Sequence, residues 1–137
     1  MEREDTNQEG RAQPLLAHRN KALLVHEDLG DLHYYFTVLE RWGYQVRACH
    51  SYDEAVRCLE SGVFDLVLVS QGSRNFEGRC VVERAIEIDR RLPVLVVARC
   101  LDMSCYLEAM QLGAVDYLAE PVAMLEMGRV LATHHRP

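Results

Sequence analysis

Residues 65–78 read DLVLVSQGSRNFEG, and this stretch decides the expected fold. Four consecutive apolar residues, Leu66 to Val69, are followed by Ser70 and then by a polar loop that contains glycine. A short run that is apolar throughout is typical of a strand covered on both faces, as in a parallel sheet. Functional side chains of open α/β sheets gather beyond the carboxyl ends of the strands, which is where Ser70 stands.

Apolar strand-like runs and helical patterns alternate five times along the chain. Strands are expected at 22–25, 44–49, 63–69, 93–98 and 114–118, and the segment after each one has apolar residues at helical spacing. This alternation predicts an α/β fold with helices on both faces of a doubly wound, five-stranded parallel sheet. The ends of the strands then bring five polar residues to one edge of the sheet: His26, Glu27, Ser70, Arg99 and Glu120.

Capping residues indicate several helix boundaries. Ser51 and Glu54 form a capping box, in which the hydroxyl accepts a backbone N–H and the glutamate reaches back. Asp102 is expected to cap the fourth helix and Gly113 to end it. The residues of that helix expected to face the core are Met103, Tyr106, Ala109 and Met110. The last helix is expected to follow Glu120-Pro121 and to reach Thr133.

The composition narrows the function classes. The chain has 137 residues, a net charge of −6 and five scattered cysteines without CxxC spacing. We expect a flexible N-terminal tail over 1–20 and one folded domain over 21–137, in the cytoplasm with reduced thiols. The acidic balance argues against nucleic-acid binding, and no apolar run approaches the roughly 20 residues of a membrane span.

The chain resembles the receiver domain of bacterial two-component response regulators over residues 21 to about 133. The resemblance rests on five phrases: KALLVHED, GYQVRACHSYDEAVRCL, FDLVLVSQGSRNFEG, LPVLVVA and AMQLGAVDYLAEPV. The spacing also agrees, since Gly78 lies eight residues after Ser70 and Glu120 lies twenty-two after Ala98. The resemblance implies a flavodoxin-like sheet of strand order 2-1-3-4-5 and a role in phosphorelay signal transduction.

The family transfers a phosphoryl group from a histidine kinase to an aspartate, and the resemblance places its functional positions on this chain. The acidic pair that holds Mg²⁺ falls on His26 and Glu27, and the nucleophile falls on Ser70. The hydroxyl residue falls on Ala98, and the lysine falls on Glu120. The switch aromatic position falls on Tyr117, which remains aromatic. Lys21 is the single lysine of the chain, so no second lysine replaces the one at position 120.

These replacements predict a degenerate pseudo-receiver. A serine hydroxyl is a weak nucleophile without an adjacent base. Mg²⁺ would lose carboxylate ligands at Ser70 and His26, and Glu120 would repel an incoming phosphoryl group. A receiver that is phosphorylated by an atypical route remains the alternative.

Other chemistries compete for the same residues. His26, Glu27 and Glu120 could bind a softer metal such as zinc or copper, since imidazole favours these ions. Ser70, His26 and Glu27 also suggest a Ser–His–acid hydrolase, although no G-x-S-x-G elbow surrounds the serine. Arg99 or Arg74 could close the pocket by pairing with Glu120 or Glu27. The alternative is that the two arginines are exposed and the histidine makes only structural hydrogen bonds.

Two further features concern partners and redox chemistry. Cys80, Cys100 and Cys105 stand near helix N-termini, where thiol pKa values can be lowered, so a redox-sensing pocket is a further alternative. A partner face, and a possible homodimer interface, is expected on the fourth helix, last strand and last helix. Its candidate residues are Met103, Leu107, Met110, Met124 and Met127.

The sequence therefore predicts a stand-alone signalling module that binds proteins and is not an enzyme. The chain ends at Pro137, soon after the last expected helix, and no output domain is expected. The expected partners are a histidine kinase or another signalling protein, with the module acting as scaffold, connector or fixed-state regulator. No cofactor, nucleic acid or membrane is expected to bind.

Overall fold

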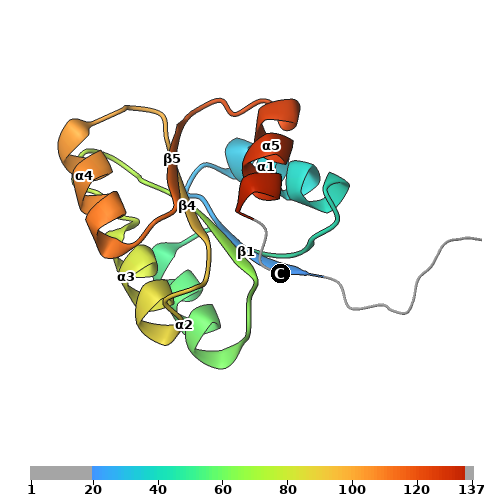
Figure 1. Ribbon diagram of the computed structural model, residues 1–137, viewed down its shortest axis with the longest axis horizontal. Helices are drawn as coiled ribbons and strands as arrows, with labels where there is room; N and C mark the ends of the chain where they lie inside the picture. Colours follow the sequence, from blue (N-terminus) through green and yellow to red (C-terminus); the bar gives the residue numbers. More distant parts are fainter. Residues whose placement is uncertain (1–19, 135–137) are drawn as a thin grey trace, which may run out of the picture.

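A computed structural model of the chain describes residues 20–134 (Figure 1). The expected tail over 1–20 lies outside the described residues except for Asn20. The elements are β1 (Lys21–Val25), α1 (Leu29–Arg41), β2 (Gln45–Cys49), α2 (Tyr52–Ser61), β3 (Leu66–Ser70), α3 (Arg79–Ile88), β4 (Val94–Ala98), α4 (Met103–Leu112), β5 (Asp116–Ala119) and α5 (Met124–Thr133). All strand pairs are parallel, and the order is β2-β1-β3-β4-β5, which confirms the predicted fold.

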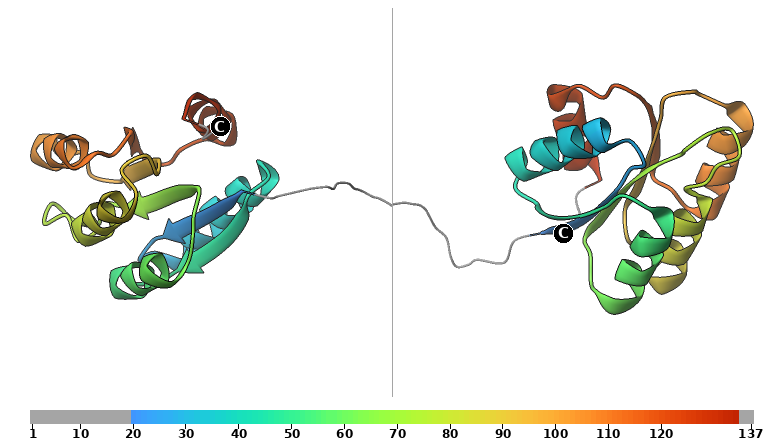
Figure 2. Two further views of the ribbon diagram at one scale, coloured as in Figure 1. Left: turned by 60° about the horizontal axis from the view of Figure 1, so that its bottom comes forward. Right: turned by 180° about the vertical axis from the view of Figure 1, so that it is seen from behind.

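The sheet separates two apolar layers. Alternate residues of β1 point to opposite faces, so Leu23 and Val25 pack with α2, α3 and α4, whereas Ala22 and Leu24 pack with α1 and α5. Figure 2 shows these two helical layers on either side of the sheet. β3 and β4 are buried at every position, as their apolar sequences predict. Burial of each such large side chain stabilises the fold by about 1.5–3 kcal/mol.

The expected helix caps are confirmed at two helices. The Ser51 hydroxyl accepts the Glu54 N–H at 3.2 Å, and the Asp102 carboxylate accepts the Cys105 N–H at 3.0 Å. Gly113 ends α4 with φ +116°, a left-handed conformation that favours glycine. The Glu54 carboxylate lies 3.6 Å from the Arg47 guanidinium.

The bounds of β3, β5 and α5 differ most from the expectation, while β2 and β4 each begin one residue later than expected. β3 begins at Leu66 rather than at Val63, which is 81% exposed, because pairing with β1 begins at the Asp65 N–H to Lys21 carbonyl bond of 2.7 Å. β5 is shifted from 114–118 to Asp116–Ala119. α5 begins at Met124 rather than directly after Pro121, because Ala123 is still extended.

The orientation of α4 also differs. Cys105 and Ala109 are its buried residues, whereas Met103 is 69% exposed and Tyr106 is 39% exposed. The Tyr106 ring makes an edge contact with Tyr117 of β5 at a centroid distance of 5.6 Å. This contact holds the tyrosine at the rim of the sheet rather than in the core.

In the layer formed by α1 and α5, two side chains connect α1 to α5 and to the residues just before α5. The Trp42 indole N–H donates to the Met124 carbonyl at 3.1 Å, and the Tyr34 hydroxyl donates to the Val122 carbonyl at 2.8 Å. The indole covers Gly128, where an added Cβ would lie 2.4 Å from the ring. Glycine at 128 is therefore what permits this close approach. Within residues 20–134, no helix is long and apolar enough to cross a bilayer.

Candidate functional site

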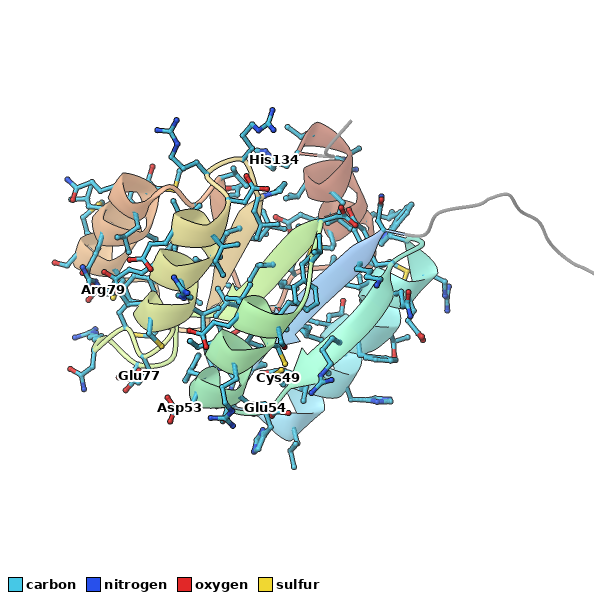
Figure 3. The ribbon with its side chains drawn as sticks, turned by 90° about the horizontal axis from the view of Figure 1, so that it is seen from below. Cys49, Asp53, Glu54, Glu77, Arg79 and His134 are labelled. Atoms are coloured by element: carbon cyan, nitrogen blue, oxygen red, sulfur yellow. The ribbon has the colours of Figure 1, made fainter. Side chains whose placement is uncertain are left out.

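The predicted site residues line a cavity of about 480 Å³ at the carboxyl edge of the sheet. Its lining residues come from the ends of β1, β3, β4 and β5: His26, Glu27, Asp28, Ser70, Gly72, Ser73, Arg99, Cys100 and Glu120. The structure therefore brings together His26, Glu27, Ser70, Arg99 and Glu120, as the topology predicts. Ala98 is buried at the end of β4. In Figure 3 the strands lie across the view and their carboxyl ends point to its lower part, where Glu77, Asp53 and Glu54 are labelled.

A buried hydrogen-bonded group occupies the β1–β5 side of the cavity. The Oε2 atom of Glu120 lies 2.9 Å from His26 Nε2 and accepts the Tyr35 hydroxyl at 2.8 Å. The His26 and Glu120 side chains are only 3% and 5% exposed, so this ion pair is shielded from solvent. The Tyr35 ring also stacks on the imidazole, with ring centroids 5.9 Å apart. Three elements, β1, α1 and β5, thus meet at one carboxylate.

This environment shifts the pKa values of both partners of Glu120. Burial lowers the pKa of His26, but the hydrogen bond and charge of Glu120, aided by Glu27 and Asp31, more than offset it, and the pKa is raised. Burial and then the Glu120 carboxylate raise the pKa of Tyr35, which stays protonated as a donor.

The second ring nitrogen of His26 is engaged as well. The Asp28 N–H donates to Nδ1 at 3.1 Å, which requires an unprotonated Nδ1 and places the proton of the neutral ring on Nε2, facing Glu120. A protonated ring gives up the Asp28 bond and gains attraction to the surrounding carboxylates. Both ring nitrogens of His26 are thus engaged in hydrogen bonds, and neither bonds to Ser70. The Ser–His–acid arrangement is therefore not formed.

Ser70 lies on the other side of the cavity with Glu27 and Tyr52. The Tyr52 hydroxyl donates to Glu27 Oε1 at 2.8 Å, and the Ser70 hydroxyl oxygen accepts the Gly72 N–H at 3.2 Å. Burial opposes ionisation of Glu27, but hydrogen bonds from its own backbone, Ser70 and Tyr52 lower its pKa. Ser70 is only 3% exposed and is held as a hydrogen-bonding residue.

Gly78 sets how closely α3 approaches Ser70. A Cβ built at Gly78 would lie 2.2 Å from the Ser70 carbonyl oxygen, so a side chain cannot be added without movement of the backbone. The Gly78 N–H also donates to the Gln71 carbonyl at 3.1 Å. The glycine at position 78 therefore has a steric cause.

The pocket-closing arginines pair with acids other than those expected. Arg99 forms an ion pair with Asp31 and lies 3.8 Å from Asp28, rather than pairing with Glu120 or Glu27. The reason is the Asp28 cap, which begins α1 over the pocket and places Asp31 in front of Arg99. Arg74 points away and lies 3.7 Å from Asp102. Both arginines are mostly exposed, so these pairs contribute about 0–1 kcal/mol.

The structure changes the candidate metal ligands. The ligand atoms of His26, Asp31 and Glu120 lie within 4.8 Å of one another, so Asp31 replaces Glu27 in the expected set. Ligand atoms of a tetrahedral zinc site would lie about 3.4 Å apart, given metal–ligand distances of about 2.1 Å. The Asp28 N–H at Nδ1, however, favours the tautomer that protonates Nε2, so a metal would have to displace both that proton and the Glu120 hydrogen bond.

Gln71 is a site residue that the sequence reasoning missed. It is fully buried, and its amide N–H₂ donates to the Cys100 carbonyl at 3.1 Å and to the Ser73 carbonyl at 3.3 Å. Its Oε1 accepts the Tyr117 hydroxyl, and that hydroxyl oxygen accepts the Asp102 N–H at 3.2 Å. One amide thus joins the loops after β3 and β4 to Tyr117. The available signal was a second polar residue, next to Ser70, after the apolar run of β3.

The lowered thiol pKa values on which the cysteine alternative rests are not found at two of its three positions. Burial raises the pKa of Cys80 and of Cys105, where lowered values were expected, because neither thiol gains enough stabilisation of its anion from the helix start. The Cys80 and Cys105 thiols donate to the carbonyls of Glu77 and Arg74.

The expected partner face is reduced to fewer residues. Met127 is fully buried on the inward side of α5 and cannot contact a partner, while Met110 and Met124 are partly buried against the core. Met103 and Leu107 are 69% and 50% exposed. Met103 also lines a groove of about 530 Å³, together with Leu101, Asp102, Tyr106, Tyr117 and Ala119.

Comparison with known proteins agrees with the fold. The family model described as the response regulator receiver domain matches residues 22–132. The chain is 28% identical over 100 residues to the transcriptional regulatory protein ZraR of Escherichia coli K12, covering 73% of this chain and 23% of that protein. The chain thus spans under a quarter of the length of the curated relatives it matches.

Solved structures are similar over most of the chain. A response regulator receiver domain protein from Methanospirillum hungatei has a TM-score of 0.79 at 21% identity, over 85% of this chain and 93% of that one. A putative response regulator from Chloroflexus aurantiacus has a TM-score of 0.75 at 25% identity, over 87% and 100%. A response regulator from Burkholderia pseudomallei, solved with a phosphorylated aspartic acid, calcium and citrate, has a TM-score of 0.72 at 21% identity, over 85% and 66%.

Proposed function

Because this chain belongs to the response regulator receiver domain family, we propose that it is a pseudo-receiver of a two-component system. In this proposal it is not phosphorylated at Ser70 and is not an enzyme. It acts by binding a histidine kinase or another signalling protein as a scaffold, connector or fixed-state regulator.

The buried Glu120 carboxylate is the observation that carries the proposal. It accepts hydrogen bonds from His26 and Tyr35 within the cavity, at the position where the family resemblance expects a lysine. Phosphoryl transfer depends on neutralising the charge of the transferred group. Here the histidine that could supply positive charge is already paired with Glu120, and further carboxylates of Glu27 and Asp31 lie beside it. A dianionic group entering this cavity would meet mostly negative charge.

The surroundings of Ser70 support the same conclusion. The similar Burkholderia pseudomallei protein carries its phosphoryl group on an aspartic acid and was solved with a calcium ion. The Ser70 hydroxyl has no histidine base, because both His26 nitrogens are engaged elsewhere. Glu27 remains as a single acid beside it, bound to Tyr52.

The Gln71 network supports a fixed conformation. Tyr117 stands at the switch aromatic position, and its hydroxyl is held by both the Gln71 side chain and the Asp102 N–H. Buried and fully paired polar groups of this kind favour one arrangement of the loops that they join. A receiver that presents one state to its partner does not require a phosphoryl group to select that state.

The exposed apolar residues beside Tyr117 are the proposed contact surface. Leu101, Met103 and Leu107 are each at least half exposed, and Leu101 and Met103 line the 530 Å³ groove. Exposed apolar groups next to a groove are typical of protein-binding sites. The surface can serve a signalling partner or a second copy of the chain.

The phosphorylation claim is tested by incubation with a small phosphodonor and Mg²⁺, followed by intact-mass measurement. We expect no gain in mass, while an aspartate-bearing receiver treated in parallel gains about 80 Da for one phosphoryl group. A stable gain of one phosphoryl group on this chain would overturn the claim.

The binding claim is tested with the Leu107→Glu variant and a matched control. We expect Leu107→Glu to weaken binding to a histidine kinase or self-association in analytical ultracentrifugation, because it puts a charge into the contact surface. Val63→Glu is the control, since Val63 is 81% exposed between α2 and β3, away from this surface. Equal effects of both substitutions would contradict the proposed location.

A further inference from the structure

Two thiols that are separate in sequence meet at the edge of the sheet. Cys49 is the last residue of β2, and Cys58 lies in the last turns of α2. Their sulfur atoms are 3.6 Å apart. Figure 3 shows Cys49 at the tip of β2 beside α2. A disulfide bond of about 2.05 Å requires the two sulfur atoms to approach by about a further 1.5 Å.

The two thiols differ in access. Cys49 is fully buried, whereas Cys58 is half-buried and lines a cavity of about 380 Å³ together with Arg47 and Lys21. Cys49 is not among the lining residues of this cavity. This cavity is formed by β2 and the end of α2 and is separate from the one at Ser70.

Arg47 supplies positive charge beside both sulfur atoms. Cys58 and a hydrogen bond with Cys49 raise the pKa of Arg47, whose guanidinium also lies 3.6 Å from the Glu54 carboxylate. Burial raises the pKa of Cys49 to about 12, so this residue stays a thiol until its partner has reacted.

We propose that Cys49 and Cys58 form an oxidation site for hydrogen peroxide or a small organic hydroperoxide. Cys58 is the attacking residue and Cys49 is the resolving residue. Cys58 is assigned the first step because it is the accessible thiol, and Cys49 the second because it is already in contact with Cys58.

The reaction has two steps. The Cys58 thiolate attacks one peroxide oxygen and the O–O bond breaks; the departing hydroxide takes up a proton, which gives a sulfenic acid and water. The Cys49 sulfur then attacks the Cys58 sulfur and the S–O bond breaks; the departing hydroxide takes the Cys49 proton as water. Two thiols lose two electrons, and one hydrogen peroxide becomes two water molecules.

The other cysteines provide an internal comparison. Cys80 and Cys100 are exposed, so exposure alone would favour their oxidation over that of Cys49 and Cys58. The Cys80 and Cys105 thiols are directed to backbone carbonyls rather than to another sulfur. Accessibility alone predicts that Cys80 and Cys100 are oxidised first, whereas the proposal predicts that Cys49 and Cys58 are.

The test treats the full chain with one equivalent of hydrogen peroxide. We expect a loss of about 2 Da in mass that dithiothreitol reverses. Peptide mapping should find the peptide that contains Cys49 joined by a disulfide to the peptide that contains Cys58. The Cys58→Ser variant should lose the change in mass, and the matched Cys80→Ser variant should keep it. Arg47→Gln should slow disulfide formation about threefold or more.

A trapping experiment identifies the attacking residue. In the Cys49→Ser variant the sulfenic acid cannot be resolved, so dimedone should label Cys58. The proposal is overturned if peroxide oxidises Cys80 or Cys100 while Cys49 and Cys58 remain thiols, or if the disulfide maps to another pair. It is likewise overturned if dimedone labels only other cysteines in the Cys49→Ser chain.

Discussion

Replacing Glu120 by glutamine tests whether the buried ion pair organises the pocket. Glutamine keeps an oxygen that can accept from His26 and Tyr35, but it removes the negative charge. The pair is shielded, since the two side chains are 3% and 5% exposed, so it does not count as a surface salt bridge. The substitution should therefore change stability, and by an amount that depends on the protonation of His26.

The expected cost differs between two pH ranges. Where His26 is protonated, removing its buried partner leaves that charge poorly compensated, a loss of about 3–5 kcal/mol. Where His26 is neutral, two hydrogen bonds to a charged acceptor become bonds to a neutral one, a loss of about 1–3 kcal/mol. The difference between the two ranges is about 2 kcal/mol.

The sign of the pH dependence follows from the raised pKa of His26. A group with a higher pKa in the folded state than in the unfolded state contributes stability that is fully present below the unfolded pKa. The ordinary value is 6.5, so this contribution is present below it and is lost as pH rises through the higher folded value. The wild type should show this loss, and Glu120→Gln should show much less of it.

Urea unfolding followed by circular dichroism at about pH 5.5 and about pH 8.5 measures both proteins under these two conditions. Glu126→Gln is the matched control, because Glu126 is exposed at the start of α5. NMR titration of the His26 ring should give a lower pKa in Glu120→Gln. Glu120→Gln would refute the reasoning if it lowered the free energy of unfolding equally at both pH values, or more at the higher one.

Three further substitutions test the rest of the site. Gln71→Leu should lower the free energy of unfolding by about 2–4 kcal/mol, because the Ser73 and Cys100 carbonyls and the Tyr117 hydroxyl lose the buried amide as their hydrogen-bond partner. Urea denaturation measures this loss, and a loss below that of a surface substitution would contradict the role of the network. Gly78→Ala should cost about 1–3 kcal/mol through the clash with the Ser70 carbonyl, whereas Gly62→Ala, whose Cβ would have ordinary contacts, should be nearly neutral in thermal unfolding. Ser70→Asp should lower the melting temperature by placing a second carboxylate beside Glu27, and intact-mass measurement should still detect no phosphoryl group; a phosphorylated Ser70→Asp chain would show that Glu120 does not block the reaction.

The sheet was predictable because its strands are uniformly apolar. β3 and β4 are buried at every position, so their sequences alone indicate two covered faces. The strand order came from the family resemblance, and the gathering of His26, Ser70 and Glu120 followed from topology. Strand starts were less predictable, since the apolar Val63 precedes β3 but is exposed.

The contacts within the site required the structure. Asp31 faces Arg99 only because α1 begins at its Asp28 cap, and helix orientation over a pocket is not encoded in residue spacing. Gln71 likewise gains its importance from the Cys100 carbonyl and Tyr117, which are remote in sequence. Met127 was assigned to a surface because methionine suits both surfaces and cores, and only packing distinguishes the two.

The contact between Trp42 and Gly128 gives the protein an intrinsic optical reporter. Trp42 is the single tryptophan, its ring is 43% exposed, and one side of it lies on α5 while its N–H is bound to the Met124 carbonyl. Any displacement of α5 relative to α1 would change the polarity around the indole and shift its emission. Association of a partner with α5 could therefore be followed by fluorescence without attaching a dye.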